Sequence, residues 1–178
     1  MSATLWTIGH ATRPWDEFLA VLRAHRIEAI ADVRRFPGSR KHPQYGGEPM
    51  RSALAREGIE YEQFPELGGR RKARADSPNT AWRNDAFRRY ADYMGTPEYQ
   101  AGEARLVALA SRRRTAILCA EALWWRCHRG LISDDLKAKG WRVLHIADAG
   151  DAKEHPFTGA ARLVGGRLSY AGDQPRLF

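Results

Sequence analysis

Residues 115–130 read TAILCAEALWWRCHRG, and this stretch decides the fold that we predict. Its first four residues are a short apolar run, which is typical of a buried strand. Reactive side chains follow where the strand ends, and a helix is expected to begin near Cys127. In open α/β sheets, ligands bind in the loops after the carboxyl ends of the strands. The stretch therefore predicts both a buried strand and the place of a functional site.

Strands and helices alternate along the rest of the chain. The apolar patterns predict strands at 5–8, 27–33, 59–64, 115–118 and 141–146. Helical spacing of apolar residues predicts helices around 14–22, 50–57, 87–94, 97–110 and 127–139. The second strand is apolar throughout, as in parallel sheets that are covered on both faces. We therefore expect an α/β fold: a doubly wound, mostly parallel five-stranded sheet with helices on both faces.

The end of the chain has a different pattern. Residues 162–170 form two short runs around Gly165-Gly166, which predicts a C-terminal β-hairpin. We expect a single domain over residues 1–170 and a flexible tail over 171–178.

Composition indicates the class of partner. The 178 residues carry a net charge of +8 with a pI near 9.9, which favours nucleic acid or a phosphorylated metabolite. The alternative is a soluble basic protein without such a partner. Two cysteines do not make a disulfide scaffold, so we expect a reducing cytoplasm. No apolar run is long enough to span a membrane, and residues 1–10 do not resemble a secretory signal.

Charged and reactive side chains follow three different predicted strands. These are His10, then Asp32 with Arg34, then Cys119 with Glu121. Parallel strands bring their carboxyl ends to one edge, where four arginines are expected to converge as an anion site beside the helix after Cys127: Arg34, Arg40, Arg126 and Arg129. Asp32 and Glu121 would supply the counter-charges. The alternative is a structural ion-pair network that ties the loops together.

Cys127 is the better candidate nucleophile of the two cysteines. A helix start flanked by Arg126 and His128 should lower its thiol pKa, whereas Cys119 at a strand end fits a small buried apolar residue. Six residues separate Cys119 from Arg126, which disfavours the Cys-x5-Arg loop of tyrosine phosphatases and rhodaneses. His10, both cysteines and His128 could bind a metal, but adjacent Cys-His lacks the spacing of a zinc pair, so we predict no metal and no cofactor.

Several pieces together resemble the bacterial and archaeal domain-of-unknown-function family numbered 488. They are Thr7-Ile8-Gly9-His10, Asp32-Val33-Arg34 with Pro37, Ser39 and Arg40, Leu67-Gly68-Gly69, and Cys119-x-Glu121 with Cys127-His128-Arg129. Ala11 stands where the family is expected to have serine. The resemblance implies an α/β fold and a shared pocket, and it carries no settled activity.

The preferred interpretation is an enzyme, or a former enzyme, that acts on nucleic acid or a nucleotide in DNA maintenance. Cys127, His128 and Glu121 would be catalytic. The substrate would be held by His10, Asp32, Arg34, Ser39, Arg40, Cys119, Arg126 and Arg129. The alternative is a non-catalytic nucleic-acid-binding module that uses the same cluster as a phosphate clamp. A snug concavity with buried Cys127, His128 and Glu121 would favour catalysis, and an open basic groove would favour binding.

Three further features bear on nucleic acid. Trp124 and Trp125 could stack bases, although one of them is expected to pack under the loop. The basic runs 70–74 and 112–114 could contact phosphates or be ordinary solvated loops. Finally, Gln174, Leu177 and Phe178 match the Gln-x-x-Leu-Phe peptide by which bacterial DNA-repair proteins dock on the sliding clamp. The alternative is that Leu177 and Phe178 fold back onto their own domain.

Overall fold

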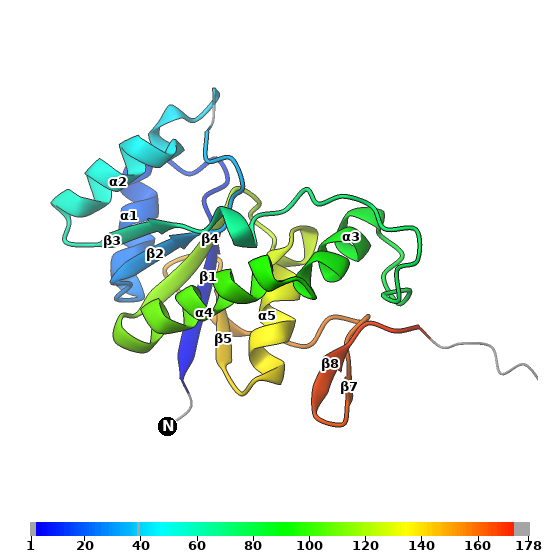
Figure 1. Ribbon diagram of the computed structural model, residues 1–178. Helices are drawn as coiled ribbons and strands as arrows, with labels where there is room; N and C mark the ends of the chain where they lie inside the picture. The colour runs from blue at the N-terminus through cyan, green and yellow to red at the C-terminus, as the bar shows by residue number, and fades with distance from the viewer. Residues whose placement is uncertain (1–2, 39, 173–178) are drawn as a thin grey trace, which may run out of the picture.

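The computed structural model describes residues 3–38 and 40–172. In this part of the chain, six strands form one mixed sheet and two more form an antiparallel hairpin (Figure 1). The sheet strands are β1 (Thr4–Gly9), β2 (Ala29–Asp32), β3 (Glu60–Gln63), β4 (Thr115–Cys119), β5 (Arg142–Ile146) and β6 (Lys153–Glu154). The hairpin strands are β7 (Arg162–Val164) and β8 (Arg167–Ser169). The α-helices are α1 (Trp15–Ala24), α2 (Gly47–Arg56), α3 (Asp85–Met94), α4 (Pro97–Arg112) and α5 (Arg129–Ala138).

The sheet has the order β3-β2-β4-β1-β5-β6. Its first five members pair in parallel, and β6 pairs antiparallel with β5 at the edge. The predicted α/β class, mostly parallel sheet and C-terminal hairpin are confirmed. The sixth strand is an addition to the five that were predicted. This strand has only two residues, and an alternating hydrophobic pattern cannot be recognised over so short a segment.

Helices cover both faces of the sheet. On one face, α1 and α2 bury Phe18, Leu22 and Leu54 against strand residues such as Ile8 and Ile30. The other face carries α3, α4 and α5, which contribute to a second cluster with Ala31 and Ile117. In Figure 1, α4 and α5 lie in front of the sheet and α1 lies behind it. This is the doubly wound arrangement that the alternating pattern predicts.

The sheet has a topological switch point between β1 and β4. These strands are neighbours, with Gly9 opposite Cys119, yet the chain leaves β1 through α1 on one face and β4 through α5 on the other. A crevice at the carboxyl ends is the usual consequence of this topology. A Cβ atom on Gly9 would lie 1.8 Å from the carbonyl oxygen of Glu121, so only glycine lets the loop after β4 cross there. The crossing brings His10 beside Cys119, whose carbonyl accepts from the His10 amide at 2.9 Å.

Helix α5 begins two residues later than expected. His128 is its N-cap, and Cys127 lies just before that cap. The helix ends as predicted, because Lys139 is the C-cap and Gly140 takes the left-handed conformation with φ +95°.

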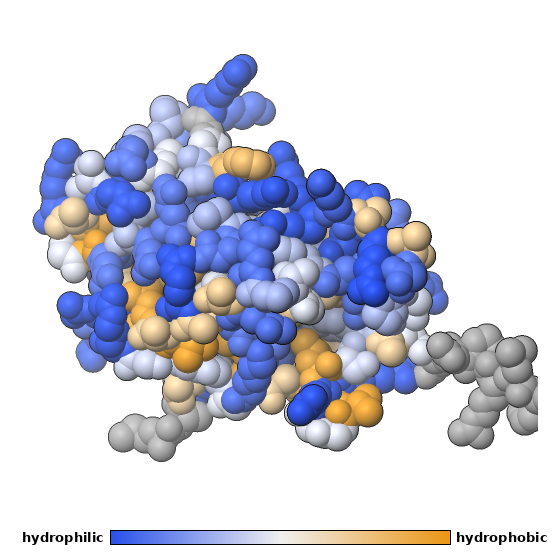
Figure 2. Space-filling view, viewed as in Figure 1, coloured by the Kyte–Doolittle hydropathy of each residue, from blue (hydrophilic) through white to orange (hydrophobic). Residues whose placement is uncertain are grey.

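The surface in Figure 2 is mainly hydrophilic. Leu163 and Val164 of the hairpin are among the large apolar residues that remain exposed. Within the described residues, no helix is both long and apolar enough to cross a bilayer.

Candidate active site

A cleft of about 860 Å³ opens at the carboxyl edge of the sheet. It is lined from the loops after β1, β2, β3 and β4 and from α3. Its cationic lining residues are Arg34, Arg35, Arg40, Lys41 and Arg70. Glu121 is the one carboxylate among the described lining residues. An excess of positive charge in a concave site attracts and concentrates anions.

Arg34 is held in the cleft wall by Asp32. Its Nε and Nη2 atoms donate to the two carboxylate oxygens at 2.9 and 2.7 Å, a bidentate pair that fixes the plane of the guanidinium. The Tyr61 hydroxyl also donates to Asp32, which is fully buried. The carboxylate lies behind Arg34 and does not line the cleft, so its part in the site is to orient the arginine.

His10 is a neutral side chain of the same wall. Its ring stacks on Tyr45 with centroids 4.2 Å apart, and its Nδ1 atom donates to the Ala11 carbonyl at 2.9 Å. The unprotonated Nε2 atom then faces Arg34 Nη1 at 3.4 Å. Burial lowers the pKa of His10 to about 4, with nearby Arg34 acting in the same direction. The imidazole is therefore neutral at neutral pH, and its Nε2 atom accepts from Arg34.

Two cleft residues have strained backbones. Ala11 and Arg70 both have a positive φ, 49° and 60°, without being glycine. Strain of this kind costs on the order of 1–3 kcal/mol and persists mainly where function needs the geometry. Arg26, outside the cleft, also has a positive φ of 55°, so this conformation alone does not mark the functional site.

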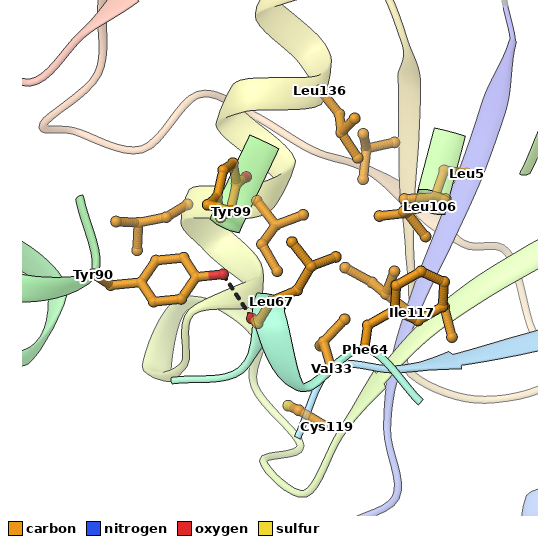
Figure 3. Close-up of a cluster of buried hydrophobic side chains, with 14 of the residues drawn as sticks. Leu5, Val33, Phe64, Leu67, Tyr90, Tyr99, Leu106, Ile117, Cys119 and Leu136 are labelled. Atoms are coloured by element: carbon orange, nitrogen blue, oxygen red, sulfur yellow. Dashed lines mark hydrogen bonds between the residues drawn. The ribbon is translucent and has the colours of Figure 1, made fainter. Parts of the chain in front are cut away.

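The two cysteines meet at the base of the cleft. Their Sγ atoms are 3.2 Å apart, and both residues line the cleft. Cys119 is 3% exposed, and Cys127 is half-buried. Figure 3 shows Cys119 at the border of the core cluster, close to Val33. The pair thus lies where the apolar core gives way to the cleft.

Arg129 lies directly beneath the cysteines. It is 1% exposed, and its backbone amide and Nε atom approach Cys127 Sγ at 3.4 and 3.2 Å. Its Nη2 atom donates to the carbonyl of Glu121 at 2.6 Å. Among the described residues, no carboxylate forms an ion pair with this guanidinium. A buried cation needs an anion close by, and the Cys127 sulfur is in that position.

The two thiols have opposite ionisation. The hydrogen bond from Cys119 and the positive charge of Arg129 lower the pKa of Cys127. The neighbouring sulfur and burial raise the pKa of Cys119. The direction follows from the geometry, because the backbone amide and the Nε atom of Arg129 both point at Cys127. Cys127 is therefore a thiolate that receives a hydrogen bond from a neutral Cys119.

His128 is placed to accept a proton. Its Nε2 atom donates to the carbonyl of Val33 at 2.8 Å, which leaves Nδ1 unprotonated. Burial lowers the pKa of His128, so the ring stays neutral. Nδ1 faces Gly69, where an added Cβ would lie at 3.3 Å, and the residue lines the cleft next to Cys127.

A buried hydrogen-bond network continues from Arg129 away from the cleft. Arg129 Nη1 donates to the Thr7 hydroxyl at 3.2 Å, and that hydroxyl lies 2.6 Å from His145 Nδ1. His145 Nε2 is 2.8 Å from His155 Nδ1. His155 Nε2 is 2.8 Å from Asp134 Oδ1, on the same helix as Arg129. The network joins the base of the cleft to the segment before the hairpin.

The structure brings together seven of the side chains predicted for the site. They are His10, Arg34, Arg40, Cys119, Glu121, Cys127 and His128. Asp32 and Arg129 lie behind and beneath this lining, and Arg126 is exposed outside it. Only two of the four arginines expected to converge therefore reach the cleft wall. Ser39, Gln174, Leu177 and Phe178 lie outside the described residues.

The two tryptophans and the basic run 112–114 take no direct part in the lining of the cleft. Trp124 packs beneath its loop, with its ring stacked on His145 at 4.5 Å, while Trp125 is 54% exposed. In the basic run 112–114, Arg112 and Arg113 pair with Glu60 at the opposite edge of the sheet. That run takes no part in the cleft.

Sequence reasoning missed several lining residues and the buried network. The missed lining residues include Arg35, Phe36, Lys41, Phe87 and Tyr90. The sequence signal for the buried network is a polar residue that lies among apolar residues of a helix or a strand. Asp134 lies on α5 between the buried Leu131 and Leu136, and His145 lies within the apolar strand β5. Among the described residues, no three His, Cys, Asp or Glu side chains group as metal ligands.

Comparison with known proteins gives one match. Neither the curated proteins nor the solved structures contain a match to this chain. The family described as "Domain of unknown function DUF488" matches residues 14–136, a span that contains every cysteine, histidine and arginine of the described cleft except His10. With more than half of its length matched, the chain belongs to the DUF488 family.

Proposed function

We propose that this protein is a cysteine-dependent enzyme that acts on a phosphate-bearing substrate of the nucleotide class, either free or as one unit of a nucleic acid. The observation that carries the proposal is the position of Cys127 at the base of a cationic cleft, with its sulfur beside a buried arginine that has no carboxylate partner among the described residues. A thiolate is the form of cysteine that acts as a nucleophile.

The cleft offers separate features for the two parts of a nucleotide. Arg34, Arg40 and Arg70 present guanidiniums, which suit phosphate oxygens. Phe36 and Phe87 present aromatic surface on which a base could stack. A volume of about 860 Å³ also falls within the range of small-molecule sites and exceeds the needs of a bare phosphate.

The chemistry assigns different roles to adjacent residues. Cys127 Sγ would bond to an electrophilic atom of the substrate as the bond from that atom to its leaving group breaks. Water would then attack the same atom, the bond to Cys127 would break with return of the thiolate, and His128 Nδ1 would accept the proton of that water. Glu121 lies at the exposed side of the cleft and could orient that water. Arg129 would act through Cys127 by stabilising its negative charge.

Binding can be tested by calorimetric titration of nucleotides into the parent protein and a double variant, Arg40→Gln with Arg70→Gln. Both residues are exposed and line the cleft, so the fold should survive. For a single-stranded oligonucleotide, each lost phosphate contact should reduce the slope of log affinity against log salt by about 1. The matched control is Arg26→Gln with Arg56→Gln, which changes the net charge equally at exposed positions away from the cleft. Equal weakening in both double variants would contradict a specific site.

Catalysis is tested separately from binding with Cys127→Ser. If the protein is an enzyme, the Cys127→Ser variant should show no turnover and form no trapped covalent adduct, while it retains the parent's affinity for nucleotide. The alternative predicted from the sequence, a non-catalytic nucleic-acid-binding module, would bind equally well in both proteins and form no adduct in either. Cys127 and His128 are partly buried in the cleft, whereas Glu121 is exposed. The sulfur beside Arg129 supports the enzyme, because a phosphate clamp has no need of a nucleophile.

A further inference from the structure

We propose that Cys119 and Cys127 are a peroxide-reactive thiol pair, in which oxidation of Cys127 by a hydroperoxide is followed by formation of a reversible disulfide with Cys119. The reactivity of this thiol pair does not depend on the nucleotide chemistry proposed above. Disulfide formation would nevertheless regulate the proposed enzyme, because it would consume the nucleophilic Cys127 sulfur.

The two sulfur atoms are close enough to bond after a small movement. The two sulfurs are 3.2 Å apart, and a disulfide bond of about 2 Å requires them to approach by only about 1 Å. Cys127 lies in the loop between the 3-10 helix Trp124–Arg126 and α5, outside regular secondary structure, where such an adjustment is least costly.

The two cysteines differ in exposure and environment. Cys127 is half-buried and faces the cleft, so a small peroxide can reach it. It also has the Arg129 guanidinium beside it, which can stabilise the thiolate before attack and the developing charge during it. Cys119 is 3% exposed and sits directly behind, which is the position of a resolving thiol.

The reaction balances with peroxide as the only co-reactant. The Cys127 thiolate attacks the terminal peroxide oxygen, the O–O bond breaks, and the Cys127 sulfur becomes a sulfenic acid as hydroxide, or alkoxide from an organic hydroperoxide, leaves and takes up a proton. The Cys119 sulfur then attacks the Cys127 sulfur, the S–O bond breaks, and the departing oxygen leaves as water with the Cys119 proton. Two thiols lose two electrons, and one hydroperoxide is reduced to two oxygen products, water and water or an alcohol.

The change in charge at Cys127 prepares the second step. In the reduced pair, the neighbouring Cys127 sulfur raises the pKa of Cys119 and keeps it protonated. Sulfenic acid formation removes that negative charge but leaves Arg129, which favours a Cys119 thiolate. The same guanidinium can thus serve first the attacking sulfur and then the resolving one.

Trypsin makes the test simple, because it cleaves after Arg126, between the two cysteines. Cys119 falls in the peptide of residues 115–126, and Cys127 falls in the peptide of residues 127–129. The reduced full-length protein is treated with one equivalent of hydrogen peroxide at neutral pH, the remaining thiols are blocked with an alkylating agent, and the digest is analysed by mass spectrometry. We expect the linked pair of peptides in most of the parent protein and its loss on treatment with dithiothreitol.

Single variants identify the role of each sulfur. Cys119→Ser should accumulate sulfenic acid on Cys127 that a dimedone probe captures, and Cys127→Ser should consume peroxide at least tenfold more slowly than the parent. Circular dichroism and thermal unfolding confirm that each variant is folded. The inference is overturned if the parent gives no linked peptides, if Cys127 ends as sulfinic acid despite an intact Cys119, or if Cys119→Ser yields no more sulfenic acid than the parent. Failure of nucleotide binding would leave it standing, because the linked peptides report only on the thiols.

Discussion

Asp134 Oδ1 lies 2.8 Å from His155 Nε2, and both side chains are fully buried. The carboxylate accepts three more hydrogen bonds, from the amide and hydroxyl of Thr158 and from the hydroxyl of Tyr170. Four donors therefore converge on one carboxylate. This fixes the remaining protons: His155 carries hydrogen on Nε2, so its Nδ1 accepts from His145, whose own Nδ1 then accepts from Thr7.

Every donor in this network points toward Asp134, and we predict that Asp134→Asn is strongly destabilising. An amide would replace one carboxylate oxygen, the acceptor for two of the four donors, with an NH2 group, and all four bonds would lose their charged acceptor. A hydrogen bond to a charged group is worth about 1.5–3 kcal/mol, so we expect a loss of at least that order in free energy of unfolding. The measurement is urea denaturation at pH 7 followed by circular dichroism.

The control for this prediction is Asp151→Asn, the same chemical change at an exposed position. It should change the free energy of unfolding by less than about 0.5 kcal/mol. Tyr170→Phe, which removes only one of the four donors, should cost about 1 kcal/mol. An Asp134→Asn protein as stable as the exposed control would show that the network contributes nothing to the fold.

The second prediction concerns thiol reactivity. Cys127 should be alkylated by iodoacetamide faster than Cys119, and the rate should remain high below the pH at which an ordinary thiol is unreactive, because its pKa is lowered by Cys119 and Arg129. In Cys119→Ala the loss of one hydrogen bond to a charged sulfur, worth about 1.5–3 kcal/mol, should raise that pKa by about 1–2 units. Mass spectrometry after timed labelling gives the rate of each cysteine as a function of pH.

The two rate profiles have to converge at high pH, where both proteins carry a full thiolate. A slower Cys119→Ala protein at every pH would indicate altered access and not altered ionisation. Equal or reversed labelling of the two cysteines in the parent would remove Cys127 as the nucleophile.

The third prediction is a dependence of stability on pH through His10. Burial lowers its pKa from the ordinary 6.5 to about 4, so between these values the unfolded chain binds more protons than the folded one. The stabilisation of the folded state by the neutral, buried His10 is therefore fully present above pH 6.5 and is lost as the pH falls toward 4. The shift corresponds to a loss on the order of 3 kcal/mol of unfolding free energy.

His10→Gln removes the titrating group while keeping a hydrogen-bonding side chain. We expect urea unfolding to show a flatter decline between pH 6.5 and 4.5 in this variant than in the parent. The quantity compared is the slope of unfolding free energy against pH, because a loss of packing at His10 lowers the stability equally at every pH. Part of the slope should remain, because burial also lowers the pKa of His145. Parallel slopes in the two proteins would refute the assignment to His10.

The fold was more predictable than the site for a physical reason. Strands such as β4 are buried on both faces, so their entire length is apolar and visible in the sequence. The same topology places the residues after β1, β2 and β4 at one edge, which correctly grouped His10, Arg34 and Cys119.

The direction of a side chain within a loop has no such period. Arg126 and Arg129 are three residues apart and equally basic, yet one is exposed outside the cleft and the other is buried beneath it. The network from Thr7 to Asp134 joins residues from three elements whose spacing in the sequence carries no signal. Their contacts depend on how the sheet and α5 pack together.

The last prediction rests on sequence alone, because Gln174, Leu177 and Phe178 lie outside the described residues. We propose that they dock on a bacterial DNA sliding clamp, since the Gln-x-x-Leu-Phe pattern combines an amide that can fix the register with two apolar side chains that can fill a pocket. Calorimetric titration of a peptide of residues 169–178 into a sliding clamp should show saturable binding. The peptide with Leu177→Ala and Phe178→Ala should bind at least about tenfold more weakly, because each truncated anchor can cost more than 1 kcal/mol.

The competing prediction is that Leu177 and Phe178 pack against their own domain, and the full-length protein separates the two. If they pack there, the double variant should lose stability by about 2 kcal/mol or more, as for other buried apolar side chains that are truncated. If they serve the clamp, thermal unfolding of the isolated protein should be unchanged while a pull-down with the clamp is lost. Pro175 stands where leucine is commoner in such peptides, so Pro175→Leu should strengthen clamp binding. A parent peptide with no more affinity than its doubly substituted partner would eliminate the clamp as a partner and remove the main sequence argument for a role in DNA maintenance.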